Sequence, residues 1–200
     1  MEDITISYKF TPIICLISLD KNNENYETVK NNILELFKKI ENIKNKDDLM
    51  VFRTTELDNY YSTMFKYLTK EEGKNNNYLE LLFYNLVEIN FFKTEYNIEQ
   101  LNDKSTLIKM LDILEERKRI ILYNLTTPVE ELNLKDDTLN NLLEEYSKVY
   151  KKFMDTEQYN FEKHYKYHKQ CEIKLVEIYK QNDKITYKDF YDIIKTCLIN

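Results

Sequence analysis

Both histidines of this 200-residue chain and one of its three cysteines fall within the short stretch FEKHYKYHKQCE, residues 161–172. His164 and His168 are four residues apart, so a helix places both rings on one face, where they can bind the same metal ion. His168 and Cys171, three residues apart, can do the same. His164 and Cys171 lie about 10.5 Å apart along a helix at ~1.5 Å per residue. One helix therefore cannot supply every ligand.

The end of the chain offers a further ligand, Cys197. If the turn near Asp183 folds the last segment back antiparallel, Cys197 comes level with residue 169, beside His168 and Cys171. One interpretation is therefore a zinc site built from His164, His168, Cys171 and Cys197. The spacings lack the paired C-x-x-C pattern of zinc frameworks, and the four residues lie on apolar stripes where histidine and cysteine also pack as core. We favour core packing and expect no cofactor.

A second chemical candidate is Asp20, which directly follows the apolar run ICLISL. A strand that ends in an aspartate is typical of metal-dependent phosphoryl-transfer and hydrolytic enzymes, in which the carboxylate binds Mg²⁺. Glu56 or Asp58, after the next predicted strand, would complete such a site. A chain with a single glycine cannot form a glycine-rich phosphate loop. The enzymatic interpretation is therefore centred on Asp20 rather than on a phosphate loop.

The composition indicates a soluble protein of the cytoplasm. Hydrophobic residues make up 42% of the chain, enough for a real core. Three cysteines without regular spacing form no disulfide framework, which favours a reducing compartment. The apolar run at residues 13–19 is too short to cross a membrane and has no basic flank. The net charge of -6 argues against binding to nucleic acid. The absence of alanine and the abundance of Asn, Lys, Ile and Tyr suggest an AT-rich genome, as in some viruses and parasites.

The N-terminal elements are predicted as a small β element followed by helices. Polar and apolar residues alternate from Ile4 to Phe10, the period of a half-buried strand, and residues 13–19 predict a second strand after Pro12. Apolar residues return at helical spacing between residues 26 and 40. The segment LMVFRTT, residues 49–55, fits a strand or a helix, and so does RIILYNL, residues 119–125, for which we favour a helix. Gly73 is predicted to end the helix that precedes it.

The C-terminal third has the most regular pattern in the chain. Apolar residues step by three and four from Leu139 to Phe153, slip near Asp155, and resume at Phe161. The pattern predicts one kinked helix of about forty residues or two abutting helices, and Thr186 with Asp189 predicts the start of a last one. We predict a mainly α fold with a small N-terminal β element, an α/β fold with a small mixed sheet being the alternative. The expected parts are residues 1–133 and residues 134–200, a long helix with a C-terminal helical hairpin, packed together as one unit.

The amphipathic faces favour a protein-interaction module, an adaptor or modulator of another protein, over an enzyme. The predicted contact surface is a coiled-coil seam flanked by Lys and Glu, through which the chain can also associate with itself. Its residues are Leu139, Leu142, Tyr146, Val149, Phe153 and Phe161. The alternatives are the metal-dependent enzyme centred on Asp20 and a helical domain with structural zinc.

Overall fold

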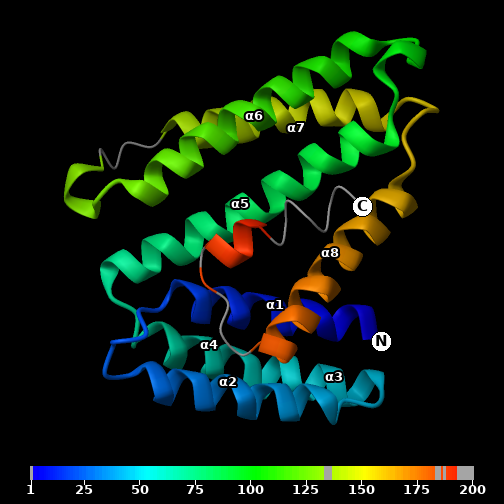
Figure 1. The fold of residues 1–200 in the computed structure, drawn as a ribbon. Coiled ribbons are helices and arrows are strands. Elements are labelled where there is room, and N and C mark those ends of the chain that lie inside the picture. The colour runs from blue at the N-terminus through cyan, green and yellow to red at the C-terminus, as the bar shows by residue number, and fades with distance from the viewer. Residues whose placement is uncertain (1, 133–136, 183–185, 187, 193–200) are drawn as a thin grey trace. The chain divides into compact units, whose positions relative to one another are not determined.

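The computed structural model describes residues 2–132, 137–182, 186 and 188–192, and the regular secondary structure of this part of the chain is helical (Figure 1). The described residues form eight α-helices, and a π-helical turn, η1, lies between the third and fourth. The bounds are α1 Glu2–Ser18, α2 Tyr26–Glu41, α3 Lys46–Val51, η1 Phe52–Leu57, α4 Asp58–Phe65, α5 Lys70–Glu95, α6 Lys104–Thr126, α7 Asp137–Met154 and α8 Phe161–Asn182. The mainly α prediction is confirmed.

The chain forms two compact units, and both are discontinuous in sequence. The first contains Met1–Asn77 and Glu172–Phe190, and the second contains Tyr78–Cys171 and Tyr191–Asn200. The units therefore divide within α5 and within α8. The expected parts, residues 1–133 and 134–200, remain a prediction from the sequence. A helix can contribute to two cores in this way because its successive turns bury side chains independently.

The predicted N-terminal β element is wrong for the described residues, which form helix α1 there. Phe10, Ile13 and Ile14 are fully buried and lie at the i, i+3, i+4 spacing of one helical face. Pro12 lies inside the helix and has no N–H to donate to the preceding turn. A short apolar run satisfies the period of a strand and of a buried helix equally well, and the packing of α1 in the first unit decides between them.

Both ambiguous segments are helical. Residues 119–125 belong to α6, as favoured from the sequence, and residues 49–55 span the end of α3 and most of η1. The hydroxyls of Thr54 and Thr55 donate to the carbonyl oxygens of Met50 and Val51, at 2.9 and 2.6 Å. These bonds satisfy backbone carbonyl groups at the point where the π-helical turn interrupts the regular i to i−4 hydrogen bonds of the α-helix. The α/β alternative has no strand among the described residues.

Helix α5 begins earlier than the sequence suggested and contains Gly73 rather than ending before it. Thr69 and Glu72 form a reciprocal capping box: the Thr69 N–H donates to Oε2 of Glu72 at 2.7 Å, and the Glu72 N–H donates to Oγ1 of Thr69 at 3.1 Å. The predicted helix stop at Gly73 is therefore wrong. A capping box that satisfies the first-turn donors outweighs the low helix propensity of one glycine.

Replacing Gly73 by alanine is expected to raise the free energy of unfolding by about 0.5–1 kcal/mol, because alanine has less backbone entropy to lose in a helix. A Cβ at this position would meet no atom within 4 Å. Urea denaturation followed by circular dichroism measures the change. Gly73→Pro is the control, and it should destabilise the protein, because the Gly73 N–H donates to the Thr69 carbonyl at 2.9 Å. An unchanged or lower stability of Gly73→Ala would contradict the prediction.

The core of the second unit is built from α5, α6 and α7, with α6 and α7 running side by side (Figure 1). Apolar side chains at helical spacing on each helix meet in one cluster: Ile89, Phe91, Phe92, Leu107, Met110, Leu111, Ile113, Leu114, Tyr146, Val149 and Phe153. Helix α7 then ends at Met154 and α8 begins at Phe161. The predicted break near Asp155 is therefore confirmed, in its two-helix form. The cap of α8 is Asn160, whose Oδ1 accepts from the Lys163 N–H at 3.1 Å.

Candidate functional site

Glu88 of α5 lies between the two histidines of α8, and all three residues belong to the second unit. Nε2 of His164 is 2.9 Å from Oε2 of Glu88, and Nε2 of His168 is 3.1 Å from Oε1. One ligand atom from each of the three side chains lies within 4.8 Å of the other two. The group therefore has the composition and the spacing of a three-ligand metal site.

Aromatic and phenolic groups fix the orientation of the histidine rings. Phe91 stacks on His164, with ring centroids 4.2 Å apart and planes inclined by 5°. On the other side of the ring, Nδ1 of His164 is 2.8 Å from the hydroxyl of Tyr159, which is hydrogen-bonded in turn to the hydroxyl of Tyr150. Tyr84 stacks on His168 at a centroid distance of 6.1 Å. Both rings are therefore held with Nε2 toward Glu88.

The surroundings keep Glu88 ionised. Burial by itself raises the pKa of this carboxyl, but hydrogen bonds from His164 and His168, together with their charges, outweigh burial and lower the pKa to about 2. The hydroxyl of Tyr146 also donates to Oε2 of Glu88, at 3.2 Å. The buried Arg117 lies over the ring of Tyr146, with its guanidinium carbon 5.9 Å from the ring centroid. An ionised, largely buried carboxylate between two imidazoles is an arrangement suited to a cation.

Of the two cysteines of the predicted metal site, the structure describes one, Cys171. Cys171 is buried but is not among the residues whose ligand atoms converge. Cys197 lies outside the described residues, so its predicted position is not tested. Among the described residues, the structure thus brings His164 and His168 together, as the sequence suggested, and adds Glu88 in place of Cys171. Sequence reasoning missed Glu88, although a carboxylate flanked by Val87 and Ile89 in a strongly apolar helix is a usable signal.

Half of the residues of the predicted interaction seam are buried in the core of the second unit. Tyr146, Val149 and Phe153 are buried in the core of the second unit, where they contact α5 and α6 residues. Leu139 and Leu142 are half-buried. Phe161 is 65% exposed and stacks on the exposed Tyr165. In this structure, Phe161 alone of the six presents its side chain broadly to solvent.

Asp20 follows a helix rather than a strand. Its carboxylate is exposed, and Oδ1 accepts from the Asn22 N–H at 2.9 Å in the loop after α1. The Asp20 N–H donates to Oε1 of Glu72 at 3.0 Å. The strand end on which the phosphoryl-transfer interpretation depends is therefore not formed, and these contacts stabilise the loop.

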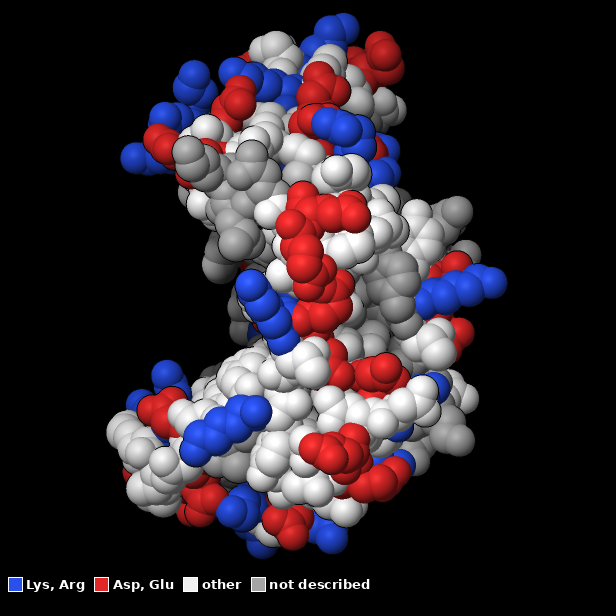
Figure 2. All heavy atoms as spheres, turned by 90° about the vertical axis from the view of Figure 1, so that its left-hand side faces the viewer, with Lys and Arg blue, Asp and Glu red and all other residues white. Residues whose placement is uncertain are grey.

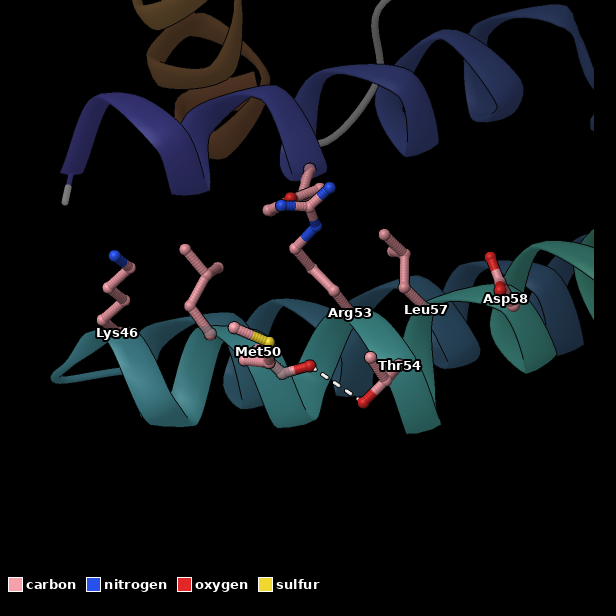
Figure 3. A pocket seen from close by; sticks show the side chains of 8 residues that line it. Lys46, Met50, Arg53, Thr54, Leu57 and Asp58 are labelled. Atoms are coloured by element: carbon pink, nitrogen blue, oxygen red, sulfur yellow. Dashed lines mark hydrogen bonds between the residues drawn. The ribbon is translucent and has the colours of Figure 1, made fainter.

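A surface groove in the first unit lies between α1 and the helix formed by α3 and η1 (Figure 3). We call it the α1–α3 groove. Its volume is about 580 Å³ and it is lined by Tyr8, Lys46, Leu49, Met50, Arg53, Thr54, Leu57 and Asp58. The side chain of Arg53 reaches from η1 toward α1, while Lys46 and Asp58 mark the two ends of the groove (Figure 3). The groove thus combines an apolar lining with charged ends.

Comparisons of the chain with protein-family models, with curated proteins and with solved structures find no match. The functional argument therefore depends on the geometry of this molecule.

Within the described residues, no helix combines the length and the apolar composition needed to cross a bilayer. On the face drawn in Figure 2, acidic and basic side chains are mixed at the upper end, and mostly acidic side chains gather in the middle.

Proposed function

We propose that the protein is a helical protein-interaction module, and that its α1–α3 groove binds an amphipathic helix of another protein. The observation that carries this proposal is an apolar groove with two cations on a chain whose net charge is -6. Helix-in-groove recognition needs apolar anchors in the groove and complementary charges at its rim. The lining of the groove supplies both.

Exposed apolar surface gathers at this groove. Met50 is 57% exposed and lines it, and the adjacent Val51 is 59% exposed. Leu49, which also lines the groove, is buried and Leu57 is half-buried, so the apolar lining is continuous with the core. Methionine adapts its shape to different partners and is common on such surfaces. A π-helical turn in the wall of a groove is also frequent at functional sites.

The charges of the groove select the partner. Lys46 and Arg53 are exposed, and within the described residues neither forms an ion pair. Against these two cations the lining has one carboxylate, Asp58. The residues from Lys46 to Asp58 extend over about 18 Å at ~1.5 Å per residue, which matches roughly three turns of a bound helix. The expected ligand is therefore a helix of about 10–12 residues with apolar residues on one face and acidic residues beside them.

Peptide selection against the full chain tests this proposal. Selected peptides should carry apolar residues at i, i+3, i+4 and i+7 with flanking Asp or Glu, and fluorescence anisotropy should show at least tenfold weaker binding to Met50→Asp and to Arg53→Glu. Met154→Asp and Arg119→Glu are matched controls, because these residues are exposed and do not line the groove. Equal loss of binding in the controls, or peptides indifferent to both groove variants, would refute the proposal. A concentration-dependent dimer abolished by Met50→Asp would instead identify a second copy of the chain as the occupant.

A further inference from the structure

We propose that Glu88, His164 and His168 form a binding site for one divalent transition-metal ion, with zinc as the expected occupant. The site is independent of the α1–α3 groove. It uses two Nε2 atoms from one face of α8 and one carboxylate oxygen from α5. Two imidazoles and a carboxylate are ligands that zinc takes, and they discriminate against Mg²⁺ and Ca²⁺, which prefer oxygen ligands.

The geometry requires only small movements to accept the ion. Zinc–nitrogen and zinc–oxygen distances are about 2.0–2.2 Å, so tetrahedral ligand atoms lie about 3.3 Å from one another. One ligand atom from each side chain already lies within 4.8 Å of the other two. The Nε2 atoms of His164 and His168 are 2.9 and 3.1 Å from different oxygens of Glu88, Oε2 and Oε1 respectively. The spacing of four residues between His164 and His168 places the two rings 5.0 Å apart, centroid to centroid. Rotation about the side-chain torsions is enough to bring all three atoms onto one ion.

The hydrogen bond on the far side of His164 suits a metal ligand. A metal-bound Nε2 carries no proton, so the proton of the neutral ring must be on Nδ1, which then donates to a neighbouring acceptor. The hydroxyl oxygen of Tyr159, 2.8 Å away, is that acceptor. The hydrogen of Tyr159 can be donated to Tyr150, because the two hydroxyls are hydrogen-bonded and either can be the donor. When the ion replaces the proton between His164 and Glu88, the tyrosine pair therefore accommodates the shift of that proton to Nδ1.

A tyrosine hydroxyl also orients the carboxylate of Glu88. The Tyr146 hydroxyl donates to Oε2 of Glu88 at 3.2 Å, which leaves Oε1 directed toward His168. The side chain of His164 is 6% exposed, whereas those of Glu88 and His168 are 19% and 20% exposed. An ion can therefore reach the site from the His168 side. Three protein ligands leave a tetrahedral ion one position for water or a further ligand.

The bound ion would join α5 to α8 within the second unit. A cation held by both helices stabilises the folded state relative to the unfolded chain, in which these residues are 76 and 80 positions apart. The same side chains without an ion form a satisfied hydrogen-bond network, so metal binding itself must be measured.

Competition with a chromophoric chelator on EDTA-treated full-length protein tests the site, with Zn²⁺ as the probe and Mg²⁺ as the negative control. We expect one Zn²⁺ per chain with a Kd of about 1 µM or tighter, and at least tenfold weaker binding in Glu88→Gln and in His168→Gln. Glu88→Gln keeps the shape of the side chain, and His168 is partly exposed, so circular dichroism should show both variants folded. Cys171→Ser is a matched control and should bind Zn²⁺ as the parent does, because Cys171 is not among the converging ligand residues.

A spectroscopic measurement on the unaltered protein keeps the test decisive if a variant fails to fold. The Co²⁺-substituted protein should show d–d absorption without a thiolate-to-cobalt charge-transfer band, and X-ray absorption of the zinc form should indicate two imidazoles and no sulfur. Binding weaker than about 100 µM, sulfur ligation, or affinity unchanged in both ligand variants would overturn the proposal.

Discussion

Replacing Phe153 by alanine is expected to lower the free energy of unfolding by about 3–5 kcal/mol. The Phe153 ring is 1% exposed and lies edge-on to Phe92, Tyr96 and Tyr159 at centroid distances of 5.8, 5.2 and 5.9 Å. Truncation removes these contacts and leaves a cavity that a close-packed core fills only in part. Guanidinium denaturation monitored by circular dichroism measures the loss.

Phe161→Ala is the matched control for Phe153→Ala. Both phenylalanines belong to the apolar pattern of the C-terminal third, but Phe161 is 65% exposed. Its removal should change the free energy of unfolding by no more than about 0.5 kcal/mol. Comparable losses in the two variants would mean that α7 does not bury the face that the structure assigns to it. The pair thus separates a residue of the core from a residue available to a partner.

Replacing Glu72 by alanine is expected to lower the free energy of unfolding by about 3 kcal/mol, because its carboxylate serves three donors at once. The backbone N–H groups of Thr69 and Asp20 donate to it at 2.7 and 3.0 Å, and the side-chain amide of Asn23 donates at 3.2 Å. Each donor left without an acceptor costs about 1 kcal/mol or more. Glu162→Ala is the control, since Glu162 and its i, i+4 partner Lys166 are both exposed and their ion pair should contribute under about 1 kcal/mol.

The contribution of Glu72 should also depend on pH. Burial raises the pKa of this carboxyl, but hydrogen bonds from the backbone of Thr69 and Asp20 and from Asn23 outweigh burial and hold the pKa below its ordinary value. The stabilisation is therefore present above the pKa of the unfolded state and is lost as the pH falls through the lower pKa of the folded state. The difference in stability between the parent and Glu72→Ala, measured by denaturation from pH 7 to pH 3, should shrink. A difference that grows on acidification would refute this account.

The sequence by itself determined the class of fold and several local features. Apolar residues spaced by three and four predicted the helical C-terminal third and its break near Asp155, because amphipathic periodicity persists over many turns there. Thr186 and Asp189 form the predicted helix start, with the Asp189 N–H donating to Oγ1 of Thr186 at 3.2 Å. Thr69 and Glu72 have the same capping-box spacing of three residues, so the sequence also contains the signal for the start of α5. Such features depend only on residues three or four positions apart.

Tertiary structure decided the features that require partners from distant parts of the chain. Residues 4–19 fit a strand and a helix alike, and burial of Phe10, Ile13 and Ile14 selected the helix. The sequence predicted the apolar face of α7. Whether that face contacts a partner or the core of its own chain depended on the positions of α5 and α6. Glu88 meets the histidines across about eighty residues because α5 and α8 lie together in the second unit. Local periodicity shows which residues share a face, and only long-range packing determines what that face contacts.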